Sequence, residues 1–137
     1  MNKQTMKIAT FLFGLVAMAS LAVAAEPTGI TEITQSDLQA AIQAKTVTLL
    51  DANASDTFNS GHIPGAISFR AHQQDLAKVL PADKSALIVA YCRDVNCAAY
   101  RQAAYAAQDL GYTNIKHFVP GIKGWIDSGA PTEKGTQ

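Results

Sequence analysis

Two cysteines, Cys92 and Cys97, are the side chains of this 137-residue chain best suited to covalent chemistry. The run 86–92 is apolar, rich in β-formers and too short for a helix, so it predicts a strand buried on both faces, with Cys92 at its polar end. Helical spacing of apolar residues follows from Ala98 to Leu110, where Gly111 stops it. A strand, loop and helix in this order point backbone N–H groups and a helix dipole into one concavity, which favours a thiolate or a bound oxyanion. We therefore expect the Cys92 thiol to be acidified.

The residues around this loop alternate between helix and strand patterns. Thr34-Gln35-Ser36-Asp37 is a capping-box pattern that predicts the start of a helix. The patterns further predict strands at 47–51, 67–69, 86–92 and 115–118, helices at 73–80 and 98–110, and a last short helix with Ile122, Trp125 and Ile126 on its apolar face. This alternation predicts an α/β fold with a mostly parallel sheet and helices on both faces. Active sites in such sheets lie beyond the carboxyl ends of the strands, where Cys92 and Asp51 both fall.

Two polar residues near these strand ends receive structural roles. Asp51 at a strand end is interpreted as a local hydrogen-bonding device rather than a catalytic group. His62 lies in the glycine- and proline-bracketed turn 61–66, where we expect it to hold backbone groups. The histidines and cysteines show no metal-ligand spacing, so no metal and no cofactor is predicted.

Four stretches in order carry a resemblance to a known family: Leu49-Leu50-Asp51, the segment 58–67 around Gly61-His62-Ile63-Pro64-Gly65, Val89-Ala90-Tyr91-Cys92, and Pro120-Gly121-Ile122-Lys123-Gly124-Trp125. From Ile33 to Pro131 the chain resembles a single rhodanese-like sulfurtransferase domain. The resemblance implies a five-stranded sheet. It also implies that Cys92 takes sulfane sulfur from a donor, holds it as a persulfide and passes it to a nucleophilic acceptor.

The chain departs from its relatives in the loop after Cys92. The expected substrate-binding residues are Arg93, Asp94, Val95, Asn96, Cys97 and Ala98. Val95 replaces a common glycine, so a loop that needed positive φ there would be strained by about 1–2 kcal/mol, or would take another path. Cys97 replaces a common arginine, which leaves Arg93 as the only cation of the loop, partly offset by Asp94. We expect poor turnover with thiosulfate.

A second departure lies beside Asp51, where relatives commonly place an Arg and a Glu. This chain has Asn53 and Thr57, so both charges are absent together and no uncompensated buried ion is left. Phosphatases on a similar scaffold place an arginine several residues after the cysteine to clamp the oxyanion. Residues 97–99 are Cys, Ala and Ala, which argues against phosphoryl transfer.

The N-terminus has the pattern of a bacterial secretory signal peptide. Lys3 and Lys7 precede a short apolar run that ends in Ala22-Val23-Ala24, so residues 1–25 are predicted to be removed. The remaining domain, 26–137, is expected in the periplasm, without a membrane anchor. The whole chain has 11 basic and 11 acidic residues, and loss of the two lysines leaves nine against 11, a net charge of −2. No basic cluster remains for nucleic-acid binding.

The predicted function is that of an exported sulfurtransferase or sulfur carrier, with a sulfane-sulfur donor and a thiol or other nucleophilic acceptor as partners. Two alternatives stay open: a non-catalytic rhodanese-like binding module, and a thiol–disulfide redox protein that uses Cys92 and Cys97. Cys97 is predicted either to resolve a persulfide on Cys92 or only to fill space at the helix start. The sequence names neither the donor nor the acceptor, and it does not predict an oligomeric state.

Overall fold

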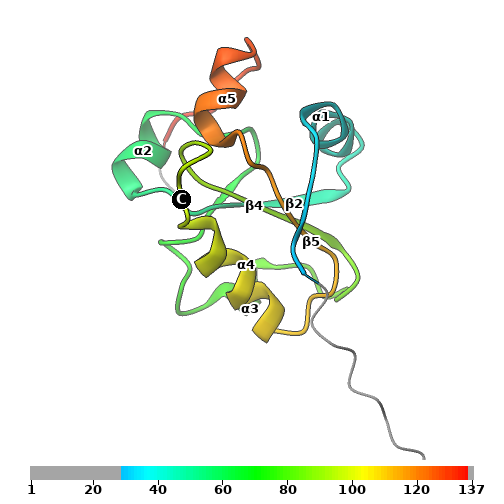
Figure 1. Ribbon diagram of the computed structural model, residues 1–137. Helices are drawn as coiled ribbons and strands as arrows, with labels where there is room; N and C mark the ends of the chain where they lie inside the picture. The colour runs from blue at the N-terminus through cyan, green and yellow to red at the C-terminus, as the bar shows by residue number, and fades with distance from the viewer. Residues whose placement is uncertain (1–28, 136–137) are drawn as a thin grey trace, which may run out of the picture.

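A parallel sheet of five strands lies at the centre of the computed structural model, which describes residues 29–135 (Figure 1). Its strand order is β1-β5-β4-β2-β3, and every neighbouring pair is parallel. The elements in chain order are β1 Thr31–Glu32, α1 Gln35–Gln43, β2 Val47–Asp51, α2 Ser55–Ser60, β3 Ile67–Ser68, α3 Leu76–Val79, β4 Leu87–Tyr91, α4 Tyr100–Asp109, β5 Ile115–His117 and α5 Gly121–Asp127. The predicted α/β class, parallel sheet and five strands are confirmed.

Strand β4 is the central strand and is buried on both faces, as its continuous apolar run predicted. Ile88 and Ala90 face one core, whereas Val89 and Tyr91 face the other, and all four are fully buried. Side chains alternate across a strand, so one strand supplies both cores when both faces are covered.

The helices form two layers, one on each face of the sheet (Figure 1). The first core contains residues of α3 and α4, chiefly the small alanines Ala103, Ala104 and Ala107, which let α4 lie close to β4. The second core contains residues of α1, α2 and α5, with Leu38, Phe58 and Trp125 at its centre. Helices on both faces of the sheet are therefore confirmed.

Helix α1 begins where the capping box predicted. The Thr34 side chain accepts the N–H of Asp37 at 3.1 Å, which satisfies one of the free donors of the first turn. Helix α5 differs in part from its prediction. Ile122 and Trp125 are buried, but Ile126 is 52 % exposed, so the prediction that it shares their buried face is wrong. In this short helix the sheet covers the Ile122–Trp125 side and leaves the next residue facing solvent.

Strand β1 and helix α2 were not predicted from the sequence, and helix α3 is much shorter than predicted. Strand β1 has two residues and helix α2 has six, too few for a periodic pattern. Helix α3 spans Leu76–Val79 rather than the predicted 73–80, because the residues before it form turns.

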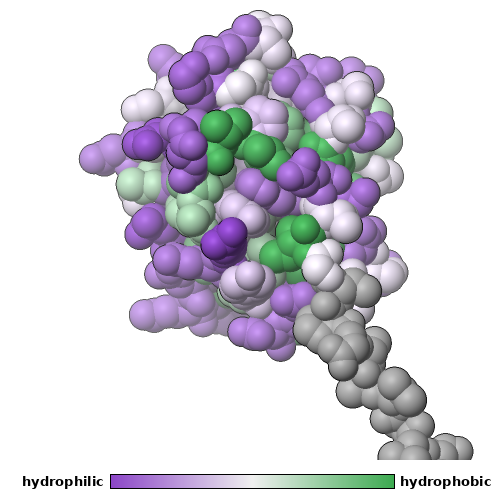
Figure 2. Space-filling model, viewed as in Figure 1, coloured by the Kyte–Doolittle hydropathy of each residue, from purple (hydrophilic) through white to green (hydrophobic). Residues whose placement is uncertain are grey.

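The predicted signal peptide, 1–25, lies outside the described residues. Within residues 29–135, none of the helices has the length and apolar character needed to cross a bilayer. The face seen in Figure 2 is largely polar, with apolar side chains in small separate groups.

Candidate functional site

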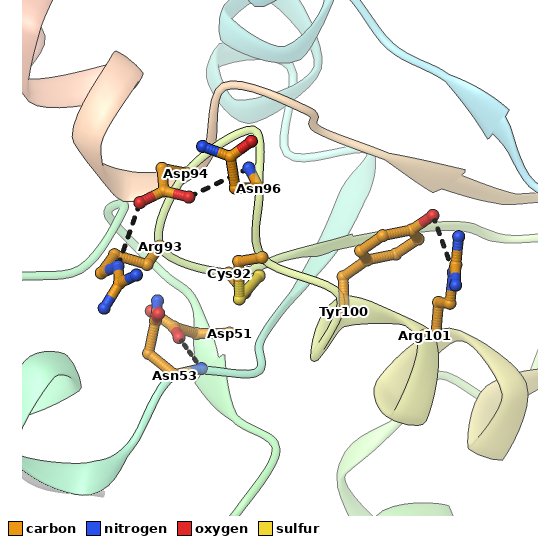
Figure 3. The surroundings of a disulfide bond; sticks show 9 residues. Asp51, Asn53, Cys92, Arg93, Asp94, Asn96, Tyr100 and Arg101 are labelled. Atoms are coloured by element: carbon orange, nitrogen blue, oxygen red, sulfur yellow. Dashed lines mark hydrogen bonds and ion pairs between the residues drawn. A yellow bond between two sulfur atoms is a disulfide. The ribbon is translucent and has the colours of Figure 1, made fainter.

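Two neighbouring strands bring Asp51 and Cys92 to one edge of the sheet (Figure 3). Asp51 ends β2 and pairs in register with Tyr91, the last residue of β4, and Cys92 follows directly. The N–H of Ala52 donates to the Tyr91 carbonyl at 2.9 Å, which fixes the two chain ends together. The predicted placement of both residues at the carboxyl edge is confirmed.

Cys92 and Cys97 are joined by a disulfide across the loop, with their Cα atoms 6.2 Å apart. Cys92 is 1 % exposed, whereas Cys97 is partly exposed. The sequence left open whether these sulfurs could meet, and the loop brings them together. In this state the Cys92 sulfur is neither free nor accessible, so any chemistry of its thiolate requires that the disulfide be opened first.

The loop path explains how Val95 is accommodated. The N–H of Cys97 donates to the Asp94 carbonyl at 3.1 Å, which closes a β-turn with Val95 and Asn96 at its centre. Among the described residues, the only non-glycine with positive φ is Lys45, so Val95 does not occupy the left-handed region. The loop takes another path, and the conditional strain at Val95 does not arise. Val95 is 66 % exposed to solvent.

Asp94 organises the same turn through its side chain. Its Oδ1 accepts the N–H of Asn96 at 3.0 Å, an Asx-turn, and its Oδ2 accepts Nε of Arg93 at 3.0 Å. The backbone N–H groups from Arg93 to Ala98 were predicted to bind an anion. Some of them are therefore engaged in hydrogen bonds within the loop itself. The backbone N–H groups of Asn96 and Cys97 and the Nε–H of Arg93 already have acceptors.

The first residues of helix α5 donate hydrogen bonds to the loop. The N–H groups of Ile122 and Lys123 donate to the carbonyls of Cys92 and Arg93, each at 2.9 Å. Gly121 makes this approach possible, because it has a φ of 63° and an added Cβ would lie 2.6 Å from the Cys92 carbonyl oxygen. Sequence reasoning quoted Gly121 only as part of a motif, and its supporting role comes from the structure.

A buried polar group lies below the cysteine (Figure 3). Asp51 Oδ1 accepts the N–H of Asn53 at 2.7 Å, which confirms Asp51 as a local hydrogen-bonding residue. Burial raises the pKa of Asp51, while the Tyr91 hydroxyl and the Asn53 N–H oppose this shift. Within residues 29–135, Asp51 Oδ2 and the Asn53 side-chain nitrogen lack a hydrogen-bond partner of standard geometry. The same burial, together with the Asp51 charge, raises the pKa of Tyr91, so this phenol stays protonated.

His62 has the structural role that its turn predicted. Its Nδ1 lies 2.9 Å from the Phe58 carbonyl, its ring stacks on Phe58 at 3.8 Å, and its backbone pairs with Glu133. A second buried histidine, His117, was not singled out by sequence reasoning as part of the site region. Its ring stacks on Tyr100 at 3.4 Å, and burial lowers its pKa, so it stays neutral.

Arg101 lies on the first turn of α4 and does not serve the loop. Its Nε donates to the Tyr100 hydroxyl at 3.4 Å, and Figure 3 shows this pair on the far side of the helix start from Arg93 and Asp94. Arg101 therefore does not supply the guanidinium clamp after the cysteine that phosphoryl transfer needs.

Comparisons with known proteins agree with this architecture. The curated HTH-type transcriptional regulator Rv0324 of Mycobacterium tuberculosis is 34 % identical over 121 residues, which are 88 % of this chain and 51 % of that protein. The chain thus spans about half the length of this relative. A rhodanese-related protein of Thermoplasma volcanium has a TM-score of 0.59 at 23 % identity, over 77 % of this chain and 99 % of its own.

Two further solved structures share the fold. A protein from Lactobacillus plantarum has a TM-score of 0.63 at 18 % identity, over 76 % of this chain and 88 % of its own. A human single-domain sulfurtransferase has a TM-score of 0.57 at 20 % identity, over 72 % of this chain and 97 % of its own. Residues 34–128 match the family described as the rhodanese-like domain, which covers most of the chain. The chain therefore belongs to the rhodanese-like domain family.

Proposed function

We propose that this protein is an exported sulfurtransferase that carries sulfur as a persulfide on Cys92. The observation that supports this most is the position of Cys92, at the carboxyl end of the central buried strand and under a turn held by α5. A buried cysteine inside a strand would be inert, whereas this one borders a polar loop that a substrate can reach once the disulfide opens. Membership of the rhodanese-like family agrees with this chemistry.

The reaction starts from the reduced protein. The Cys92 thiolate attacks the sulfane sulfur of the donor, the sulfur–sulfur bond of the donor breaks, and its electron pair leaves with the donor's remaining group. A new sulfur–sulfur bond joins the Cys92 sulfur to the transferred sulfur. The thiolate of an acceptor then attacks that outer sulfur, takes it as a persulfide and releases the Cys92 thiolate.

Cys97 acts in this scheme as a resolving cysteine. Its thiolate attacks the inner sulfur of the Cys92 persulfide, forms the Cys92–Cys97 disulfide and releases hydrosulfide, which balances atoms and electrons. The disulfide supports this step, since the loop brings the sulfurs of Cys92 and Cys97 into contact in this fold. Activity then requires a thiol that reduces the bridge.

The test is intact mass spectrometry of the reduced protein after incubation with thiosulfate or another sulfane donor. We expect one added sulfur atom in the wild type and none in Cys92→Ser, with Cys97→Ser as the matched control that keeps the nucleophile. Absence of an adduct with every donor would reject the sulfurtransferase and favour the non-catalytic binding module.

The disulfide itself favours a second candidate function, thiol–disulfide exchange with a partner protein. The partly exposed Cys97 sulfur is the one an incoming thiolate reaches, so attack there gives a mixed disulfide on Cys97 and frees the Cys92 thiolate. Pull-downs from periplasmic extract distinguish the candidates, because Cys92→Ser cannot reclose the bridge and retains a mixed disulfide. Recovery of one specific thiol protein supports exchange, and recovery of none supports a small acceptor.

A further inference from the structure

An internal carboxylate already accepts hydrogen bonds from two of the groups in the loop after Cys92 that could bind an anion. Asp94 accepts one hydrogen bond from the Asn96 backbone and one from the Arg93 side chain, both at 3.0 Å. These are a backbone donor and a guanidinium, the two kinds of group that bind an oxyanion substrate. The Asp94 side chain is 22 % exposed, so it lies in the loop rather than in bulk solvent.

Asp94 remains charged at neutral pH. The hydrogen bonds from Arg93 and from the Asn96 N–H lower its pKa, and each stabilises the carboxylate form. An oxyanion that enters the loop must therefore displace this carboxylate or accept repulsion from it.

The space beside the loop is also short of free positive charge. A pocket of about 340 Å³ adjoins the turn and is lined by Asp94, Val95, Asn96, Pro120, Lys123, Gly124 and Asp127. Its one lysine, Lys123, pairs with Asp127 at 2.5 Å. The pocket thus holds two carboxylates against one ammonium, and the loop beside it adds one guanidinium that is already paired.

We propose that Asp94 is a specificity-determining residue that excludes oxyanion donors such as thiosulfate and selects hydropersulfides, R–S–SH, as sulfur donors. This inference rests on the proposed sulfurtransferase function. In its protonated form a hydropersulfide carries neither an oxyanion nor a charge on its outer sulfur, so it reaches Cys92 without competing for the donors that Asp94 holds. The Cys92 thiolate attacks the outer sulfur, the S–S bond of the donor breaks, Cys92–S–SH forms and R–S⁻ leaves.

The decisive experiment compares two alkylating reagents that differ in charge. In reduced Cys97→Ser, where Cys92 is the only thiol, rate constants are measured with anionic iodoacetate and neutral iodoacetamide. Asp94→Asn in this background keeps an acceptor for the Asn96 N–H but removes the charge. Removal of one negative charge two residues along the chain from Cys92, in partly hydrated surroundings, corresponds to a rise of about three- to tenfold in the ratio of iodoacetate to iodoacetamide rates.

Two matched variants separate charge in the loop from other effects. Asp109→Asn removes the same charge at the opposite end of α4 and is expected to leave the ratio unchanged. Asp94→Ala removes the charge and the turn-forming acceptor together, so it reports the cost of losing the turn. A ratio in Asp94→Asn within about twofold of that in Asp109→Asn would overturn the proposal.

A second measurement links the ratio to sulfur transfer. Persulfide loading of the Cys97→Ser protein should be slower with thiosulfate than with cysteamine hydropersulfide, and Asp94→Asn should narrow this difference. Equal loading by both donors in the parent would also overturn the proposal. Failure of the proposed function looks different, since no donor would then load any variant while the alkylation ratio would still respond to Asp94.

Discussion

At the residue scale, the proposed chemistry depends on Cys92, which is buried, and Cys97, which is partly exposed. With the disulfide closed, the nucleophile is absent, and the oxidised wild type should not load sulfur. Cys97→Ser cannot form the bridge, so it should load to the same extent with and without prior reductant. Quantitative intact mass after incubation with a sulfane donor measures this.

The same experiment separates resolution from packing at Cys97. If Cys97 resolves the persulfide, the persulfide on Cys97→Ser should outlive that on the reduced wild type several-fold. Equal lifetimes and equal redox sensitivity in the two proteins would leave Cys97 with a packing role only.

Because Asp51 is buried, we predict that the free energy of unfolding depends on pH. Burial raises its pKa in the folded protein, so its contribution is fully present below the unfolded value and is lost as pH rises through the raised value. Asp51→Asn keeps an acceptor for the Asn53 N–H and does not ionise. Its free energy of unfolding should therefore improve relative to wild type as pH rises from 4 to 8, by about 1.4 kcal/mol for each unit of pKa shift.

Urea unfolding at several pH values tests this. Asp109→Asn, on the surface at the end of α4, is the control and should show no such trend. A constant difference between Asp51→Asn and wild type across this range would show that Asp51 is ionised without cost, and would contradict the burial argument.

Sequence reasoning predicted the position of Cys92 at a strand end but not its disulfide with Cys97. The position of Cys92 was predicted from an apolar run that stops at a polar loop, a pattern formed by neighbouring residues of the sequence alone. The disulfide and the hydrogen bond from the Asn96 N–H to Asp94 depend on the exact path of the loop. The sequence did not determine this path, because Val95 stands where relatives commonly have a glycine. The Asx-turn at Asp94 did have a local signal, since Asp is favoured at the first position of a turn.

At the element scale, helix α5 contacts the loop after Cys92 closely at Gly121. Gly121→Ala would place a Cβ 2.6 Å from the Cys92 carbonyl oxygen and would also strain a φ of 63°. The N–H groups of Ile122 and Lys123 would then lose their acceptors in the loop. We expect a loss of more than about 2 kcal/mol in unfolding free energy and a slower reaction of reduced Cys92 with iodoacetamide.

Gly129 offers a matched control, because it has a φ of 80° but nothing within 4 Å of an added Cβ. Gly129→Ala should cost only the backbone strain, about 1 kcal/mol, and should leave Cys92 reactivity unchanged. Equal effects of the two substitutions would mean that α5 does not support the loop.

The elements themselves were predictable in proportion to their length. Strands β2 and β4 and helix α4 each carry a periodic or continuous apolar pattern, and each was located to within two residues. Strand β1 and helix α2 have too few residues for such a pattern. Helix α2 has Ala54 as its N-cap residue, which provides no side-chain cap, so the usual start signal is missing, and its Phe58 packs in the second core.

At the scale of the whole molecule, the disulfide should add little to stability. It closes a loop of only a few residues, with a sequence separation of five, and short loops restrict the unfolded chain least. Chain-entropy arguments give about 2 kcal/mol as an upper figure for a loop of this size. Urea unfolding with and without reductant measures the difference, and Cys97→Ser should match the reduced wild type. A much larger loss would indicate a mainly structural bridge.

The last prediction joins export to the redox state of the site. A disulfide persists in an oxidising compartment and is reduced in the bacterial cytoplasm, so the proposed export would determine which form of the loop exists in the cell. The chain 1–137 expressed in a Gram-negative host should reach the periplasm, lose residues 1–25 and present no thiol to an alkylating reagent added before lysis. The chain 26–137, started from a new Met, should stay in the cytoplasm with two reactive thiols. Cys97→Ser should show one thiol in both places. Retention of the leader, or two free thiols in the periplasmic form, would contradict the prediction and would leave the reduced sulfur carrier as the resident state.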